Sequence, residues 1–250
     1  MAPRIPKQVD SEIYDLLNES IHTGEVIPEI QFRGLIRKAE KLPVPYRYAC
    51  LSALYSHSLD YEQAIENAIN SIKYGCDEQF CVENALSALS NNKLFSDMVR
   101  LSKEFPILLN YSDSRNESYD AAIFTFDLDY CEYIANNFEL RNDESLYDYE
   151  AFRSYLEHDE ELIRKASEYM SYVFDGLTVL FKQSSIRAKS FGFGLMSDSI
   201  DQYLEINVLL HSSSIEQAVD FELSWHEHIA KFDVSEPQLC NIAFVVGSGE

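Results

Sequence analysis

Basic residues are scarce in this chain. Its 250 residues include 20 Lys and Arg against 42 Asp and Glu, which gives a formal net charge of −22 at pH 7. Nucleic acids and anionic lipids are bound through basic surfaces, because their phosphate groups repel carboxylates. We therefore expect a protein that binds neither a nucleic acid nor a membrane surface directly.

Long apolar runs are also absent. No stretch reaches the roughly 18–20 apolar residues that a helix needs to cross a bilayer, and residues 1–7 lack the apolar core of a secretory signal. Hydrophobic residues still make up 46% of the chain, a normal share for a folded globular protein. We therefore expect a cytoplasmic protein of one large or two small domains.

Glycine and cysteine are few, and their placement excludes several kinds of site. The chain has no Gly-Lys-Ser/Thr phosphate loop, and Gly192 and Gly194 lack the third glycine of a dinucleotide loop. The five cysteines share no metal-binding spacing, so we expect reduced thiols. No serine lies in a nucleophile elbow. The sequence therefore predicts no catalytic residue, no metal and no cofactor, hence a non-enzymatic protein.

The segment from Trp225 to His228 contains the nearest approach to a metal motif. A zinc-protease helix places two histidines four residues apart on one face. Here His226 and His228 are two residues apart, so on a helix they point roughly 200° away from each other. We expect no shared metal at this pair.

A helix-turn-helix pattern with nearly constant spacing is the clearest feature that the chain does have. Its first copy runs over residues 48–68, and similar apolar patterns follow about 34 and 69 residues later. The first helices of these later copies hold Val82, Ala85, Leu86 and Leu89, and then Ala121, Ala122 and Phe124. In this register Met98 and Tyr133 take the place of the small residue Ala64. A period of this length is typical of stacked helical pairs.

The first copy, residues 46–75, resembles a tetratricopeptide repeat. The residues at its consensus positions are Tyr48, Leu51, Ser52, Tyr55, Ala64 and Ala68. The resemblance implies an array of antiparallel helical pairs over residues 1–148 that presents a binding surface rather than a catalytic pocket. Small residues such as Ala64 would let paired helices approach closely, while Asp60 suits a helix N-cap and Gly75 a helix end. An irregular all-helical domain is the alternative.

The sequence pattern changes after about residue 175. We expect residues 149–175 to form one acidic connecting helix that ends near Gly176. Two strands, a helix and a third strand are predicted at 190–195, 202–210, 215–230 and 239–246, while 177–188 fits either helix or strand. Ser214 is the expected N-cap of the helix at 215–230. The expected fold is therefore mainly α, with a tetratricopeptide-like array followed by a small C-terminal α+β module. This module, residues 176–250, has the order β-β-α-β and is expected to contain an antiparallel sheet.

The second strand carries the strongest pattern of the module. Leu204, Ile206, Val208 and Leu210 alternate with more polar residues and would share one face. A three-stranded sheet has two edges, and an open edge would allow a homodimer or strand addition by a partner. Coverage of the sheet by the preceding helices is the alternative.

Acidic residues concentrate between residues 111 and 175, where 17 Asp and Glu stand against 5 Lys and Arg. The densest parts are 142–150 and 157–161, and tyrosines are interleaved with them. Tyrosine is a preferred anchor in protein interfaces, and an acidic field speeds the approach of a basic partner. The predicted partner-binding residues are Tyr147, Asp148, Tyr149, Glu150, Tyr155, Asp159, Glu160 and Glu161. A solvated face that serves only solubility is the alternative.

These features predict a non-enzymatic cytoplasmic protein that binds another protein. A basic toxin or nuclease, neutralised in the manner of an antitoxin or immunity protein, is one expected partner. The second hypothesis is an enzyme or ligand sensor with its site in the C-terminal module, which a deep polar pocket near Glu205, Asn207 and His211 would favour. The third is a structural subunit of a larger assembly.

Overall fold

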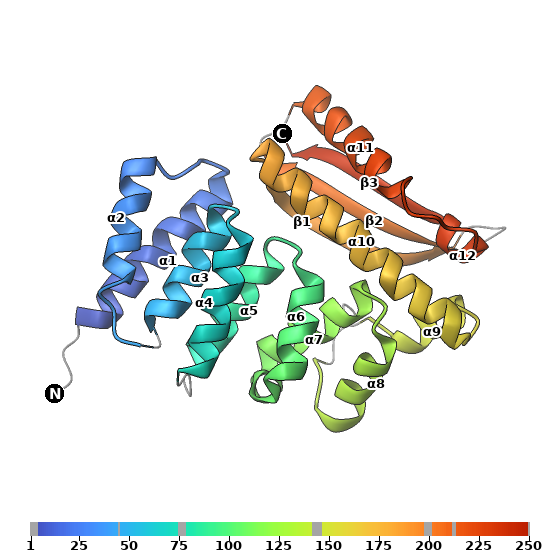
Figure 1. The fold of residues 1–250 in the computed structure, drawn as a ribbon, viewed down its shortest axis with the longest axis horizontal. Helices are drawn as coiled ribbons and strands as arrows, with labels where there is room; N and C mark the ends of the chain where they lie inside the picture. The colour runs from blue at the N-terminus through green and yellow to red at the C-terminus, as the bar shows by residue number, and fades with distance from the viewer. Residues whose placement is uncertain are drawn as a thin grey trace.

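The computed structural model describes residues 5–44, 46–74, 79–141, 147–197, 202–211 and 214–249. Helices fill the first half of the chain and follow one another in a row, and a long helix then lies across a three-stranded sheet (Figure 1). A mainly α fold with a C-terminal α+β module is thus confirmed. No helix of the described residues is long and apolar enough to cross a membrane.

The first half consists of short helices that pack against their neighbours along the chain. They are α1 (Ile5–Thr23), α2 (Glu29–Ala39), α3 (Tyr46–His57), α4 (Tyr61–Lys73), α5 (Gln79–Ser90), α6 (Phe95–Glu104), the 3-10 helix η1 (Pro106–Asn110), α7 (Ser112–Phe124) and α8 (Leu128–Asn137). The expected end of α4 at Gly75 lies outside the described residues.

The turns inside successive helical pairs share one geometry. Leu59, Lys93 and Phe126 have left-handed backbones, with φ of 62°, 61° and 52°, and lie 34 and 33 residues apart. The next amide in each turn donates to a carbonyl five residues earlier: Asp60 N to Tyr55 O, Leu94 N to Leu89 O, and Asp127 N to Ala122 O. These bonds close the preceding helix in the Schellman arrangement. The helical pairs therefore recur about every 34 residues, close to the predicted period.

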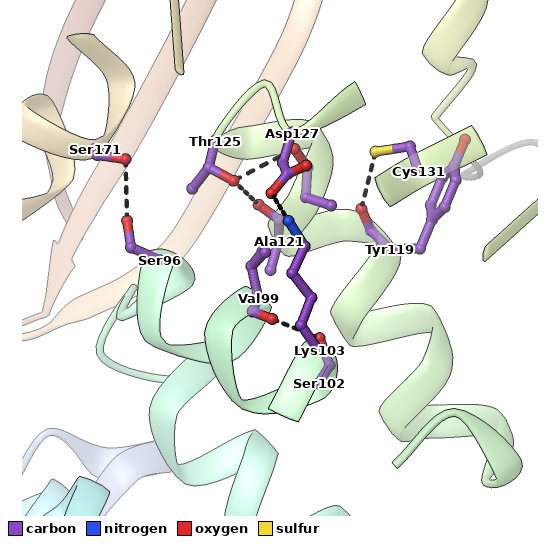
Figure 2. Close-up of polar contacts among 11 residues, drawn as sticks. Ser96, Val99, Ser102, Lys103, Tyr119, Ala121, Thr125, Asp127, Cys131 and Ser171 are labelled. Atoms are coloured by element: carbon purple, nitrogen blue, oxygen red, sulfur yellow. Dashed lines mark hydrogen bonds and ion pairs between the residues drawn. The ribbon is translucent and has the colours of Figure 1, made fainter. Parts of the chain in front are cut away.

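The third pair begins two residues earlier than the sequence spacing predicted. Because its turn falls at Phe126, Cys131 rather than Tyr133 occupies the position of Ala64. Cys131 is fully buried, and its thiol lies 3.9 Å from the carbonyl oxygen of Tyr119 (Figure 2). Tyr133 instead points outward and is 47% exposed. The register that aligned Tyr133 with Ala64 is therefore two residues off in the third pair.

The first pair is held by the small residues that the sequence singles out. Ala64 and Ala68 are fully buried, and the Ser52 hydroxyl donates to the carbonyl oxygen of Ala64 at 2.9 Å. This bond needs the two helix backbones to lie close together. Asp60 caps α4, as predicted, by accepting from the amide of Gln63 at 3.4 Å.

The remaining elements build the C-terminal part. They are α9 (Tyr149–Tyr155), α10 (Glu160–Ser184), β1 (Ala188–Ser197), β2 (Gln202–His211), α11 (Ile215–Ile229), α12 (Pro237–Cys240) and β3 (Ile242–Gly249). Ser214 forms a capping box with Gln217 at the start of α11, as expected from the sequence.

The predicted connecting helix over 149–175 is two helices. Glu157 and His158 adopt left-handed backbones, which end α9, and Asp159 then caps a new helix. That helix, α10, continues to Ser184 instead of ending near Gly176, so most of 177–188 is helical. A Cβ at Gly176 would lie 2.1 Å from the Cδ2 atom of His228, so the glycine provides room for α11 rather than a helix end.

The prediction of an antiparallel sheet is only half right. The strand order is β1-β2-β3, and β1 runs antiparallel to β2, with Phe193 opposite Ile206. However, β3 runs parallel to β2, with Ile242 beside Leu204. Helix α11 lies between these two strands in the chain and carries it back to the end at which β2 starts, as a parallel connection requires. The sheet is therefore mixed, and a homodimer through its edges stays a prediction.

One hydrophobic core joins the two parts of the molecule. Leu204, Ile206, Val208 and Leu210 are buried on one face of the sheet, as predicted, and belong to a cluster that extends from Ala49 to Val246. Trp225 of α11 is fully buried and donates its indole N–H to the carbonyl oxygen of Val173 in α10 at 3.1 Å. A smaller core lies among α1, α2 and α3.

Substitution of Ala64 tests the helical pairing. In Ala64→Arg a long charged side chain meets the close contact of α3 and α4, so we expect a loss of about 3 kcal/mol or more in the free energy of unfolding. For a chain of this size that corresponds to roughly 6–12 °C in Tm. Glu66→Arg, on the exposed face of the same helix, is the control and should melt close to the parent. Equal Tm values for all three proteins would contradict the packing.

Candidate functional site

Carboxylates gather where α8, α9 and the first turn of α10 meet. We call this group the acidic surface, and its members are Asp129, Glu132, Asp148, Glu150, Glu157, Asp159, Glu160 and Glu161. All of them are exposed except Glu132, which is half-buried. Between residues 127 and 163 only Arg141 and Arg153 carry a full positive charge. Residues 142–146, part of the predicted acidic cluster, lie outside the described residues.

Arg153 lies at the centre of the acidic surface. Its guanidinium pairs with Asp129 and Glu132 of α8, and with Glu160 of α10 at 3.6 Å. The Arg153 side chain is only 12% exposed, whereas these carboxylates are open to solvent. One positive charge therefore ties three helices together while facing three negative charges, and the surface around it stays strongly negative.

Two predicted binding residues also stabilise helix ends. Asp148 accepts from the amide of Glu150 at 3.0 Å, and Asp159 accepts from the amides of Glu161 and Leu162 at 2.8 and 3.0 Å. Such caps satisfy amides that the helix leaves unpaired, and a negative charge there also interacts favourably with the helix dipole. The acidic run thus has a structural role in addition to any role in binding.

Two of the predicted tyrosines belong to the interior. Tyr155 is 7% exposed, and its hydroxyl donates to the carbonyl oxygen of Gln238 at 2.6 Å. Tyr147 is half-buried, and its ring lies edge-on to Phe124 at 5.3 Å between centroids. Burial raises the pKa of Tyr155 to about 12. Tyr155 therefore does not reach the surface on which the prediction placed it.

Tyr149 and Tyr133 are the aromatic residues that reach the acidic surface. Partial burial and the neighbouring carboxylates of Glu150 and Glu132 raise the pKa of Tyr149. Tyr133 projects from α8 and stacks on Tyr130, with 5.9 Å between centroids. Tyr133 was among the tyrosines interleaved with the acidic segment but was not one of the predicted binding residues, because the densest acidic parts of the sequence lie further along the chain.

The two histidines of the 225–228 segment serve packing. His226 Nε2 lies 3.0 Å from the carbonyl oxygen of Phe244, and His228 Nε2 lies 3.1 Å from that of Tyr172. They therefore contact different elements. In the part of the chain that the structure describes, no three His, Cys, Asp or Glu side chains converge in a way that would hold a metal ion.

A polar pocket near Glu205, Asn207 and His211 would have favoured a ligand site in the C-terminal module. The structure contains a cavity that lies near only one of these residues, His211. On β2 the Asn207 side-chain amide donates to the Glu205 carboxylate at 2.6 Å, and neither residue lines the cavity. The cavity has a volume of about 430 Å³ and lies beside His211 at the end of β2, but α1, α3 and α5 form its other walls. It therefore belongs to the junction of the helical array with the module rather than to the module alone.

The unfolding free energies of two Tyr→Phe variants test whether Tyr155 is buried and Tyr149 lies at the surface. In Tyr155→Phe the carbonyls of Gln238 and Asn241 lose their donor, so we expect the free energy of unfolding to fall by about 1 kcal/mol. In Tyr149→Phe the lost hydroxyl lies near the surface beside Glu150, and water can take its place there, so we expect no measurable change. Urea unfolding of the two variants and the parent makes the comparison. A Tyr155 variant as stable as the parent would place this hydroxyl at the surface.

Comparisons with protein families, with curated proteins and with solved structures gave no match.

Proposed function

We propose that the protein is a non-enzymatic protein-binding protein and that the acidic surface is its binding site for a basic protein. The observation that carries the proposal is the excess of unpaired carboxylates around Arg153. On the acidic surface the charge is almost entirely negative around this one cation, and Glu150, Glu157 and Glu161 form no ion pair with any residue that the structure describes.

This arrangement suits binding better than it suits folding. Like charges held close together repel one another, so the cluster opposes the compact state unless cations approach it. A basic partner would supply those cations and would be attracted from a distance. Tyr149 and the exposed ring of Tyr133 would add the aromatic contacts in which interface energy concentrates.

The partner class we propose is a basic toxin or nuclease that the acidic surface neutralises. We place this encounter in the cytoplasm, where the free thiols of Cys50, Cys131 and Cys240 would stay reduced. Because the carboxylates would cover the basic surface that such an enzyme needs for nucleic acid, binding and inhibition would coincide.

Charge neutralisation tests the site. We expect the variant Glu150→Gln/Glu157→Gln/Glu161→Gln to lose most capture of basic proteins from a lysate of the native host, because these three carboxylates have no structural ion pair. The control Glu19→Gln/Glu62→Gln/Glu216→Gln has the same net charge and changes exposed residues far from the surface. Mass spectrometry of the captured proteins is the measurement. Equal capture by both triple variants would show that net charge alone acts and would contradict the site.

The aromatic contribution has a separate kinetic signature. With the captured partner, Tyr149→Ala should speed dissociation by about fivefold to thirtyfold, equivalent to ~1–2 kcal/mol for an interface anchor. The triple Gln variant should instead slow association and flatten its dependence on salt, because charges at the rim steer the encounter. Surface plasmon resonance at two salt concentrations separates these effects. If neither rate changes, the acidic surface serves solubility.

A further inference from the structure

The cavity at the junction of the two halves has a charge opposite to that of the rest of the protein. Its lining includes Lys93, Arg187 and Lys189, together with His57 and His211, and no Asp or Glu. In a chain with about twice as many acidic as basic residues, a lining whose charged residues are all basic distinguishes this site from the remaining surface. The charges of the lining therefore favour an anion.

Lys93 reaches this site through the repeated turn geometry. It occupies the left-handed turn position that Leu59 and Phe126 hold in the neighbouring helical pairs, and both of those side chains are buried and apolar. The same geometry thus directs an amine inward. Its Nζ lies 5.3 Å above the centre of the Phe191 ring, and its one hydrogen bond among the described residues is a 3.4 Å contact to the carbonyl oxygen of Ser90. Burial lowers the pKa of Lys93 to about 8, so the amine is still largely protonated at pH 7.

Arg187 and His57 form a second group in the lining. Arg187 lies between α10 and β1 and donates to the backbone carbonyl of His57. Burial and the nearby Arg187 charge lower the pKa of His57 to about 3, so its ring is neutral. One ring nitrogen, Nε2, lies 3.2 Å from the Ser20 hydroxyl. The other, Nδ1, is buried and has no hydrogen-bond partner among the described residues.

One acidic group, Glu117, lies close to Lys93 but does not neutralise the lining. It lies behind Ser87, whose hydroxyl donates to its carboxylate at 2.9 Å. Burial raises the pKa of Glu117 to about 7, so at neutral pH it carries only part of a negative charge. Three basic side chains thus face the cavity against one partly ionised carboxylate outside it.

We propose that this cavity binds a small organic molecule that carries a phosphate group. A phosphate monoester brings up to two negative charges, which match Lys93 and Arg187 in the walls and Lys189 at the exposed margin. The uncharged part of the ligand would meet asparagine, serine and aliphatic side chains from α1 and α5. A volume of about 430 Å³ is within the range of small-molecule sites and suits a nucleotide or a sugar phosphate.

This site is separate from the acidic surface. Ser185, at the C-terminal end of α10, lines the cavity, whereas the acidic surface includes the first turn of the same helix. The 25 residues of α10 separate them by about 37 Å at 1.5 Å per residue. A contact between the helical array and the C-terminal module borders the cavity, since His211 Nε2 lies 2.6 Å from the carbonyl oxygen of Ile21. A bound ligand would therefore bridge the helical array and the module.

Thermal melting and calorimetry of the full chain test the proposal. The probes are AMP, glucose 6-phosphate and inorganic phosphate at millimolar concentration, with adenosine, glucose and citrate as controls. We expect at least one phosphorylated probe to raise Tm and to bind with one site per chain, while its dephosphorylated counterpart does not. AMP and glucose 6-phosphate distinguish a nucleotide from a sugar phosphate. Absence of a response to all three phosphate-bearing probes would overturn the proposal, as would an equal response to citrate.

Two variants assign the response to the cavity. Lys93→Met places an apolar side chain where Leu59 and Phe126 stand in the other turns, so the protein should fold, while affinity should fall by about tenfold to a hundredfold. Lys189→Ala changes an exposed residue at the cavity margin and should also weaken binding. Lys231→Met, an exposed lysine outside the lining, is the matched control. Binding that all three variants retain would place the phosphate elsewhere and overturn the proposal.

Discussion

Contact between aromatic rings of α6, α7 and β1 is the interaction on which the rest of the structure depends. Phe95 and Phe124 of the helical array meet Phe191 of β1 at 5.4 and 5.2 Å between centroids, and Phe124 also meets Phe193 at 4.9 Å. Such edge-on and tilted contacts bury large apolar areas and fix the rings relative to one another. They place the first strand of the sheet directly on the helical array, so the two halves share one core instead of moving as separate domains.

Both candidate sites follow from this junction. The cavity exists because the start of β1 and the end of β2 are held against α1, α3 and α5, and Lys93 enters it from the turn beside the aromatic contact. At the other end of α10, Tyr155 bonds to the segment before β3, which holds α9 in place and presents the carboxylates around Arg153. One rigid frame therefore keeps a basic interior site and an acidic outer surface apart, although their charges would attract each other.

The repeated turn also gives the array its regularity. A left-handed residue other than glycine costs roughly 1–2 kcal/mol, and Leu59 and Phe126 offset this cost by burying their side chains. Lys93 lacks that full apolar compensation and holds a partly desolvated charge instead. A position that is strained and poorly compensated often has a functional role, which agrees with the phosphate site proposed for this cavity.

The sequence by itself determined the features that depend on local chemistry. Alternation at Leu204 and Ile206 predicted a strand with one buried face, Ser214 and Asp60 predicted helix caps, and the spacing of small and apolar residues predicted helical pairs. Each depends on side-chain periodicity or on bonds within a few residues, which are visible along the chain. The sequence also predicted the approximate position of the acidic surface, because most of its carboxylates lie close together between residues 148 and 161.

Only the tertiary structure decided which side chains face inward and which distant segments meet. Tyr155 and Tyr149 have similar acidic neighbours in the sequence. However, Tyr155 is buried against α12, whereas Tyr149 is partly exposed to solvent. Gly176 looked like a helix end until His228 of α11 was placed against it. The parallel direction of β3 depends on the crossover by α11, and the basic cavity draws Lys93 and Arg187 from segments 94 residues apart. These properties arise from packing between elements that are far apart in the chain. No local pattern in the sequence indicates such contacts.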